Sequence, residues 1–262
     1  MTVGWVTDTV TPDLSRALHY TLLWGFDGVV LRTVGAGRVP FVNEGALRRR
    51  LEADDVPILA IDPGLFEGEA SARATWMNEL ATFDDTAAFC ARMGVTCVRA
   101  GALAASADAF DEATAAGALR QLGDLAARAG VTVAVRNDAD SAVSTGASLA
   151  SLLRAVGHAA VQADWRPFDA LAAGEAPSDG LAALQASVEI ATLTVRDATE
   201  AGDAAAPGEG RVDWDAQVGA LGPGWGGAVV LEIHGRPVGS FGLRASSAAI
   251  STVRRARRTD RP

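Results

Sequence analysis

Lysine is absent from this chain of 262 residues, and all 23 basic residues are arginine. A Schiff base with a carbonyl substrate, an internal pyridoxal phosphate aldimine and a Walker-type phosphate loop each require a lysine, so these kinds of chemistry are excluded. The remaining charge is acidic, because 32 Asp and Glu residues give a net charge of −9 and a pI near 4.8. An acidic chain of this kind argues against duplex nucleic acid as a partner.

Cysteine and long hydrophobic runs are also scarce. Cys90 and Cys97 are the two cysteines, and they fit a reducing interior as buried thiols better than a disulfide. No apolar run approaches the ~18 residues that a membrane span requires. The N-terminus has no basic segment ahead of an apolar stretch, as a secretory signal would have. We therefore expect a cytoplasmic protein with no membrane partner.

Short apolar, β-branched runs alternate with helical segments eight times along the chain, with no hairpin signal between any pair. This alternation, at a length near the roughly 250 residues typical of the fold, predicts a closed (β/α)8 barrel. We expect one domain over residues 1–262, ending in a basic tail at 254–262. The expected strands are 3–6, 28–31, 56–61, 95–99, 131–135, 159–163, 190–195 and 228–233.

Helices with apolar residues at helical spacing lie between these strands. Examples are the segments 13–24, 43–53, 75–93, 115–129 and 147–156. Asp13 and Asn43 stand where N-caps belong, and Gly94, Gly130 and Gly157 stand where a left-handed residue ends a helix.

Polar residues follow nearly every expected strand. In such barrels the working side chains lie at the carboxyl ends of the strands, and residues two apart on a strand share a face. Each of these residues alone could form an external salt bridge, but together they predict a polar pocket that in part attracts anions. They are Asp8, Arg32, Asp62, Arg99, Arg136 with Asp138, Asp164 with Arg166, Thr194 with Arg196, and Glu232 with His234.

Several segments resemble the xylose isomerase-like barrels, which include sugar-phosphate isomerases and epimerases and the family-2 AP endonucleases. The resemblance covers the whole chain and is strongest after residue 120. The most specific combination is 207–214 (Pro-Gly-Glu-Gly-Arg-Val-Asp-Trp), followed by a strand that ends in glutamate. The other segments that carry the resemblance are 131–138, 161–165, 190–197 and 226–234.

The resemblance implies a divalent cation held by Glu, Asp, His and Glu on strands five to eight. Asp164 and Glu232 match the second and fourth ligands, whereas Arg136 and Thr194 stand in the first and third positions. Of the three histidines, only His234 could reach the pocket. At ~4 Å and an effective dielectric constant of ~20, a dication and a guanidinium repel by roughly 8 kcal/mol.

We therefore expect no cofactor, although Asp164 and Glu232 could still hold manganese or zinc. Our hypothesis is that the Arg136 guanidinium takes the place of the cation and bridges the two carboxylates. The alternative is that Arg136 turns outward and the pocket is merely degenerate.

The resemblance implies an isomerase or epimerase of sugars, sugar phosphates or sugar acids. Glu232 would be the acid or base, Asp164 and Arg136 would complete the catalytic set, and a homo-oligomer is possible. Expected contacts to an anionic, sugar-like substrate are His234, Arg32, Arg99, Arg166, Arg196 and Asp138. The alternative is a non-catalytic barrel that binds a small anionic, sugar-like ligand or supports a partner protein. Repair of abasic DNA is disfavoured, because the chain has few histidines and an acidic pI.

Overall fold

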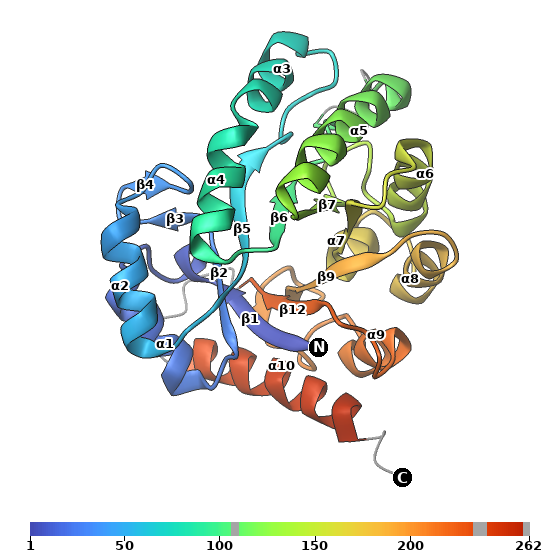
Figure 1. The fold of residues 1–262 in the computed structure, drawn as a ribbon. Helices are drawn as coiled ribbons and strands as arrows, with labels where there is room; N and C mark the ends of the chain where they lie inside the picture. The colour runs from blue at the N-terminus through green and yellow to red at the C-terminus, as the bar shows by residue number, and fades with distance from the viewer. Residues whose placement is uncertain (106–109, 233–239, 259–262) are drawn as a thin grey trace. The chain divides into compact units, whose positions relative to one another are not determined.

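A computed structural model describes residues 1–105, 110–232 and 240–258. Eight parallel strands form a closed barrel in the order β1-β12-β9-β8-β7-β6-β5-β2, which confirms the predicted (β/α)8 fold (Figure 1). These strands are β1 (Thr2–Val6), β2 (Gly28–Leu31), β5 (Ile58–Leu65), β6 (Cys97–Ala100), β7 (Thr132–Arg136), β8 (Val161–Trp165), β9 (Ile190–Val195) and β12 (Ala228–Leu231).

The contacts of the chain divide it into two compact units. The first unit is Met1–Leu59 with Leu193–Pro262, and the second unit is Ala60–Thr192. The boundaries therefore fall inside β5 and β9. The organisation as one domain over residues 1–262 remains a prediction.

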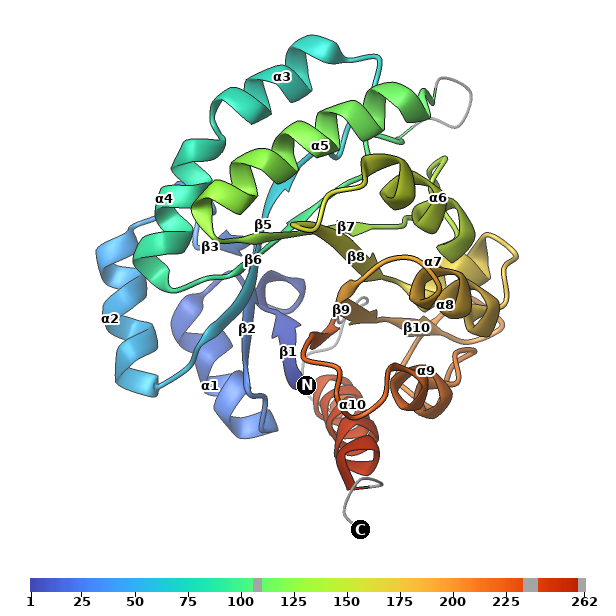
Figure 2. The ribbon, with the colours of Figure 1, turned by 45° about the vertical axis from the view of Figure 1, so that its right-hand side comes forward.

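The two N-caps that the sequence predicts in the first unit are confirmed. Asp13 accepts the Arg16 N–H at the start of α1, and Asn43 accepts the Ala46 N–H at the start of α2. In Figure 2, α10 lies beside α9. The elements of this unit are η1 (Thr7–Thr9), α1 (Leu14–Trp24), β3 (Thr33–Val34), β4 (Gly37–Arg38), α2 (Glu44–Asp54), β10 (Asp197–Ala198), β11 (Ala204–Ala205), α9 (Trp214–Leu221) and α10 (Ser240–Arg258).

The second unit corrects one helix boundary. The segment 75–93, predicted as one helix, is two helices that meet at Thr82, whose φ of −99° and ψ of 3° leave the helical region. The Thr82 hydroxyl donates to the Asn78 carbonyl at 3.0 Å, as the hydroxyl of a helix-interrupting Thr often does. The helices of this unit are α3 (Arg73–Ala81), α4 (Phe83–Met93), α5 (Glu112–Ala129), α6 (Gly146–Val156), α7 (Pro167–Ala172) and α8 (Pro177–Gln185).

The predicted glycine caps are confirmed, because Gly94, Gly130 and Gly157 end α4, α5 and α6 with φ values of 68°, 68° and 59°. Figure 1 shows α5 between α4 and α6. Within the described part of the chain, none of the helices combines the length and the hydropathy that a membrane crossing requires. The expected tail at 254–262 is partly helical, since α10 continues to Arg258. Residues 259–262 lie outside the described part.

Candidate functional site

The carboxylate of Asp164, at the end of β8, is bound by Arg99 of β6. The Arg99 Nε and Nη2 atoms both donate to Asp164 Oδ2, at 2.9 and 2.7 Å. Both side chains are 0% exposed. A second guanidinium lies near the same oxygen, with Arg166 Nε at 3.9 Å. Asp164 is therefore the counter-ion of a wholly buried arginine.

Arg136, at the end of β7, has different partners from those predicted. Its Nη2 donates to Glu67 Oε1 at 2.9 Å, and its Nη1 lies 3.7 Å from Asp62 Oδ2. The hypothesis that Arg136 bridges Asp164 and Glu232 is wrong, because Glu67 and Asp62 take its guanidinium. The alternative that it turns outward also fails, since the side chain is only 12% exposed.

The electrostatic setting of Arg136 keeps it charged. Burial disfavours the cation and would lower its pKa, and the neighbouring guanidinium of Arg99 acts in the same direction. The carboxylates of Asp62 and Glu67 outweigh both effects and raise the pKa of Arg136 above its ordinary value. The site therefore contains a permanent cation at the end of β7.

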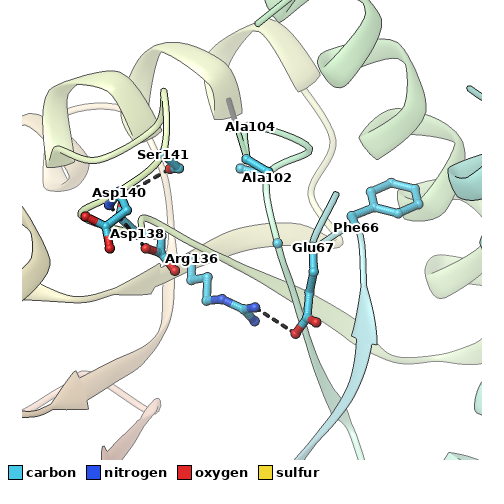
Figure 3. Close-up of a pocket in the computed structure, with 10 residues that line it drawn as sticks. Phe66, Glu67, Ala102, Ala104, Arg136, Asp138, Asp140 and Ser141 are labelled. Carbon is cyan, nitrogen blue, oxygen red and sulfur yellow. Dashed lines mark hydrogen bonds and ion pairs between the residues drawn. The ribbon is translucent and has the colours of Figure 1, made fainter. Parts of the chain in front are cut away.

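Arg136 lines a pocket of about 200 Å³. In Figure 3 the Arg136 side chain extends from the end of β7 toward Glu67, which follows β5. Asp138, predicted to share a face with Arg136, lines the same pocket with Asp140 and Ser141. The Asp140 N–H donates to Asp138 Oδ1 at 3.3 Å, so the loop after β7 turns back on itself at this point. The pocket thus combines one guanidinium with three carboxylates and a hydroxyl.

Two loops beside this pocket have non-glycine residues in the left-handed region. Phe66 has a φ of +57° and Leu103 a φ of +55°. The Phe66 N–H donates to Glu79 Oε2 at 2.8 Å, and the Leu103 N–H donates to the Phe66 carbonyl at 3.0 Å. Burial raises the pKa of Glu79, the hydrogen bond from Phe66 lowers it, and the charge of Glu67 raises it, with a net rise. Strained conformations of this kind persist only where neighbours hold them, so the pocket wall is fixed before any ligand arrives.

Sequence reasoning missed two residues of this region. Glu67 was not foreseen, because it lies beyond the predicted end of its strand. Asn137 is fully buried and joins the ends of β7 and β8. Its Nδ2 donates to the carbonyls of Ser144 and Arg166, both at 3.0 Å, and its Oδ1 accepts the Arg166 N–H at 3.0 Å. An amide directly after a strand, flanked by charged residues, was the available signal.

The first unit holds the other predicted site residues. Arg32 Nε donates to both carboxylate oxygens of Asp8, at 3.1 and 2.9 Å. Glu232 is buried, at 4% exposure, and its N–H donates to the Val195 carbonyl at 2.9 Å. Thr194 is buried and Arg196 half-buried. His234 lies outside the described residues.

Asp197, which was not predicted, explains much of the 207–214 segment. It is buried, and its carboxylate accepts four hydrogen bonds. The donors are the N–H groups of Ala198, Arg211 and Val212, at 2.9, 2.9 and 3.4 Å, and the indole of Trp214 at 2.9 Å. Gly210 packs so closely on this carboxylate that a Cβ atom would overlap it. The Asp197 carboxylate therefore explains the glycine at position 210 and the tryptophan at position 214. Its hydrogen bonds also hold the segment in one conformation.

The donor set does not fit the divalent cation that the resemblance implies. Arg136 and Thr194 replace two ligands, and the Asp164 carboxylate already accepts two N–H groups from Arg99. Across the described ranges, no group of three or more His, Cys, Asp or Glu side chains is placed to share an ion. Whether the protein binds a divalent cation or another cofactor remains a prediction.

One comparison with known proteins identifies the family. A family model described as xylose isomerase-like TIM barrel matches residues 19–256. Among curated proteins, none matches the chain by sequence.

Solved structures of sugar epimerases are similar in fold. A structure of L-ribulose 3-epimerase has a TM-score of 0.79 at 17% identity, covering 98% of this chain and 96% of that one. D-psicose 3-epimerase with D-tagatose, from Clostridium cellulolyticum H10, has a TM-score of 0.76 at 16% identity, covering 98% and 99%. The IolI protein with a bound zinc atom has a TM-score of 0.73 at 20% identity, covering 98% and 96%.

Proposed function

The chain belongs to the xylose isomerase-like TIM barrel family, and from this membership we propose that it isomerises or epimerises a small sugar-like molecule without a divalent cation. The observation that carries the proposal is the permanently charged Arg136. It lines a pocket at the end of β7, in the position where the resemblance implies a metal-binding glutamate.

The proposed reaction moves a proton at a carbon next to a carbonyl. A base removes the proton, the electron pair moves to the carbonyl oxygen, and the resulting enolate is reprotonated. A fixed guanidinium can stabilise the negative oxygen, so this role goes to Arg136. The proton carrier that we propose is Glu232, a buried carboxylate directly after β12. One carboxylate suits transfer on a single face of the substrate, so isomerisation is favoured over an epimerisation that needs two bases.

The charges of the pocket narrow the substrate. One guanidinium faces the carboxylates of Glu67, Asp138 and Asp140, so a doubly charged phosphate ester would be repelled. A neutral sugar or a singly charged sugar acid would be repelled less, and its hydroxyl groups can donate to the acidic side chains. The volume of about 200 Å³ is below the roughly 300–1,000 Å³ of drug-sized sites, which also favours a small ligand.

Four other predicted contacts stay in the proposal, one of them with fewer N–H groups available, and one contact is removed. Arg166, Arg196 and His234 stay as proposed substrate contacts. Arg32 is held by Asp8 and would contact substrate only with its remaining N–H groups. Arg99 is removed from the set, because its side chain has no exposed surface.

The test is a panel of sugars, sugar acids and sugar phosphates assayed by NMR for conversion, with and without EDTA. For any substrate found, Glu232→Gln should lower kcat by at least about 100-fold, the range that a general acid or base contributes. Glu52→Gln, at an exposed position of α2, is the matched control and should leave kcat unchanged. Loss of activity on chelation, or an unchanged kcat in Glu232→Gln, would contradict the proposal.

A second candidate is a non-catalytic barrel that binds the same kind of ligand. The observation that favours it is the complete burial of Asp164, which leaves a residue of the implied catalytic set unable to touch a substrate. A thermal-shift screen with sugar acids separates the two candidates. Saturable stabilisation without product formation over long incubation would favour the binding protein.

A further inference from the structure

We infer that Arg99 is the fixed internal cation of Asp164, and that this guanidinium excludes a divalent cation from the carboxylate. The inference concerns metal binding and the role of Asp164. It shares with the proposed function the absence of a divalent cation, but it does not depend on which reaction the chain catalyses.

The strand register explains how Arg99 reaches a carboxylate two strands away. On β7, which lies between β6 and β8, Ala134 is the register partner of Arg99 and of Gln162, and Arg136 is the partner of Asp164. Register partners on neighbouring parallel strands point to the same side of the sheet. Ala134 presents only a methyl group, so the long side chain of Arg99 can cross β7 there and meet Asp164. A larger residue at 134 would block this path.

The geometry of the pair leaves little room for an ion. The shared oxygen of Asp164 accepts two N–H groups, and Arg166 Nε lies 3.9 Å from it. Both Arg99 and Asp164 are 0% exposed. A dication near this oxygen would also meet the charge of Arg136, whose backbone is in register with Asp164.

The pair has a consequence for the chemistry of Asp164. A carboxylate with two charge-assisted hydrogen bonds and no exposed surface is neither a free ligand nor a proton carrier. Asp164 is thus a positioning residue, which corrects its predicted place in the catalytic set. Removing the Arg99 guanidinium would take both of these hydrogen bonds from a buried carboxylate, which a divalent cation could then neutralise.

The experiment measures divalent cation binding by elemental analysis of the purified protein and by thermal shift with millimolar MnCl2 or ZnCl2. The wild-type chain should carry no stoichiometric ion and show no saturable stabilisation. Arg99→Met should lower the melting temperature by about 6–20 °C, as loss of one partner of a buried ion pair does. Part of this loss should return with Mn²⁺. Arg128→Met, at an exposed position of α5, should change neither the melting temperature nor the response to the ion.

The double variant Arg99→Met/Asp164→Leu keeps the outcome decisive if Arg99→Met alone does not fold. It removes both charges at similar volume, so it should melt at a higher temperature than Arg99→Met and ignore Mn²⁺. A wild-type chain that binds one Mn²⁺ or Zn²⁺, with loss of that ion in the double variant, would overturn the inference. A double variant as unstable as Arg99→Met would also overturn it, because the two residues would then not act as a pair.

Discussion

Two arginine side chains of this protein carry charge into buried settings. Arg99 is wholly buried against Asp164, and Arg136 is 12% exposed between Glu67 and Asp62. A buried lysine readily loses its proton, whereas a guanidinium keeps its charge and offers a planar fork of N–H groups. A chain that uses buried cations as fixed electrostatic elements therefore has a physical reason to build them from arginine.

Gly101 provides a test of the pocket wall at the level of one atom. A Cβ atom at this position, just after β6, would overlap the Phe66 carbonyl, so the strained loop that carries Glu67 would have to move. Gly101→Ala should lower the free energy of unfolding by about 1–3 kcal/mol, measured by urea denaturation.

Gly117, in the interior of α5, is the matched control. A Cβ atom there meets nothing within 4 Å, so Gly117→Ala should stabilise the protein by about 0.5–1 kcal/mol through helix propensity. Equal effects of the two substitutions would mean that Gly101 is not tightly packed against Phe66.

At the scale of strands, the sequence identified all eight barrel strands and placed seven of their carboxyl ends within two residues, but it misplaced the end of β5 by four. The segment Asp62-Pro63-Gly64 has the composition of a turn, so the expected strand stopped at residue 61. In the structure β5 runs on to Leu65, and its register with β6 shifts between Ile61 and Leu65. A bulge admits proline and glycine inside a strand. Because the strand is longer, Glu67 joins Asp62 as a partner of Arg136.

The candidate site was also predictable only in part, because contacts across strands depend on their register. Arg136 and Asp138 were foreseen to share a pocket, because alternation along one strand needs no knowledge of neighbours. The partner of Asp164 was not foreseen, since it depends on the small side chain of Ala134 on the strand between. Contacts across strands depend on register and side-chain size together, and one sequence does not specify that combination.

Asp197 allows a test of the loop that contains the 207–214 segment. Its buried carboxylate accepts hydrogen bonds from three backbone N–H groups and from Trp214. Asp197→Ala should leave these donors unsatisfied and lower the free energy of unfolding by about 2–4 kcal/mol in urea, with a change in tryptophan fluorescence. Asp203→Ala, at an exposed position of the same loop, should change stability by less than about 0.5 kcal/mol. Similar losses in both variants would refute the anchoring role of Asp197.

At the scale of the whole chain, the absence of lysine simplifies the response to alkaline pH. Carboxyl groups ordinarily titrate near pH 4 and arginine above pH 12. The chain has two cysteines and one tyrosine besides. Burial raises the pKa of Cys90 to about 12, and burial with the charge of Asp164 raises the pKa of Cys97 to about 12. The protonation of both thiols therefore differs between the folded and unfolded chains in this range.

The sign of the effect follows from these pKa values. Between about pH 9 and pH 12 the folded state keeps thiol protons that the unfolded chain has lost, so the free energy of unfolding falls as pH rises. The slope is at most about 1.4 kcal/mol per pH unit for each thiol, and smaller for Cys97, whose side chain is partly exposed. Urea unfolding between about pH 8 and pH 11 measures it. The double variant Cys90→Ala/Cys97→Ala should show a smaller fall in the free energy of unfolding as pH rises. If it keeps the wild-type slope, groups other than the thiols cause the loss of stability at alkaline pH.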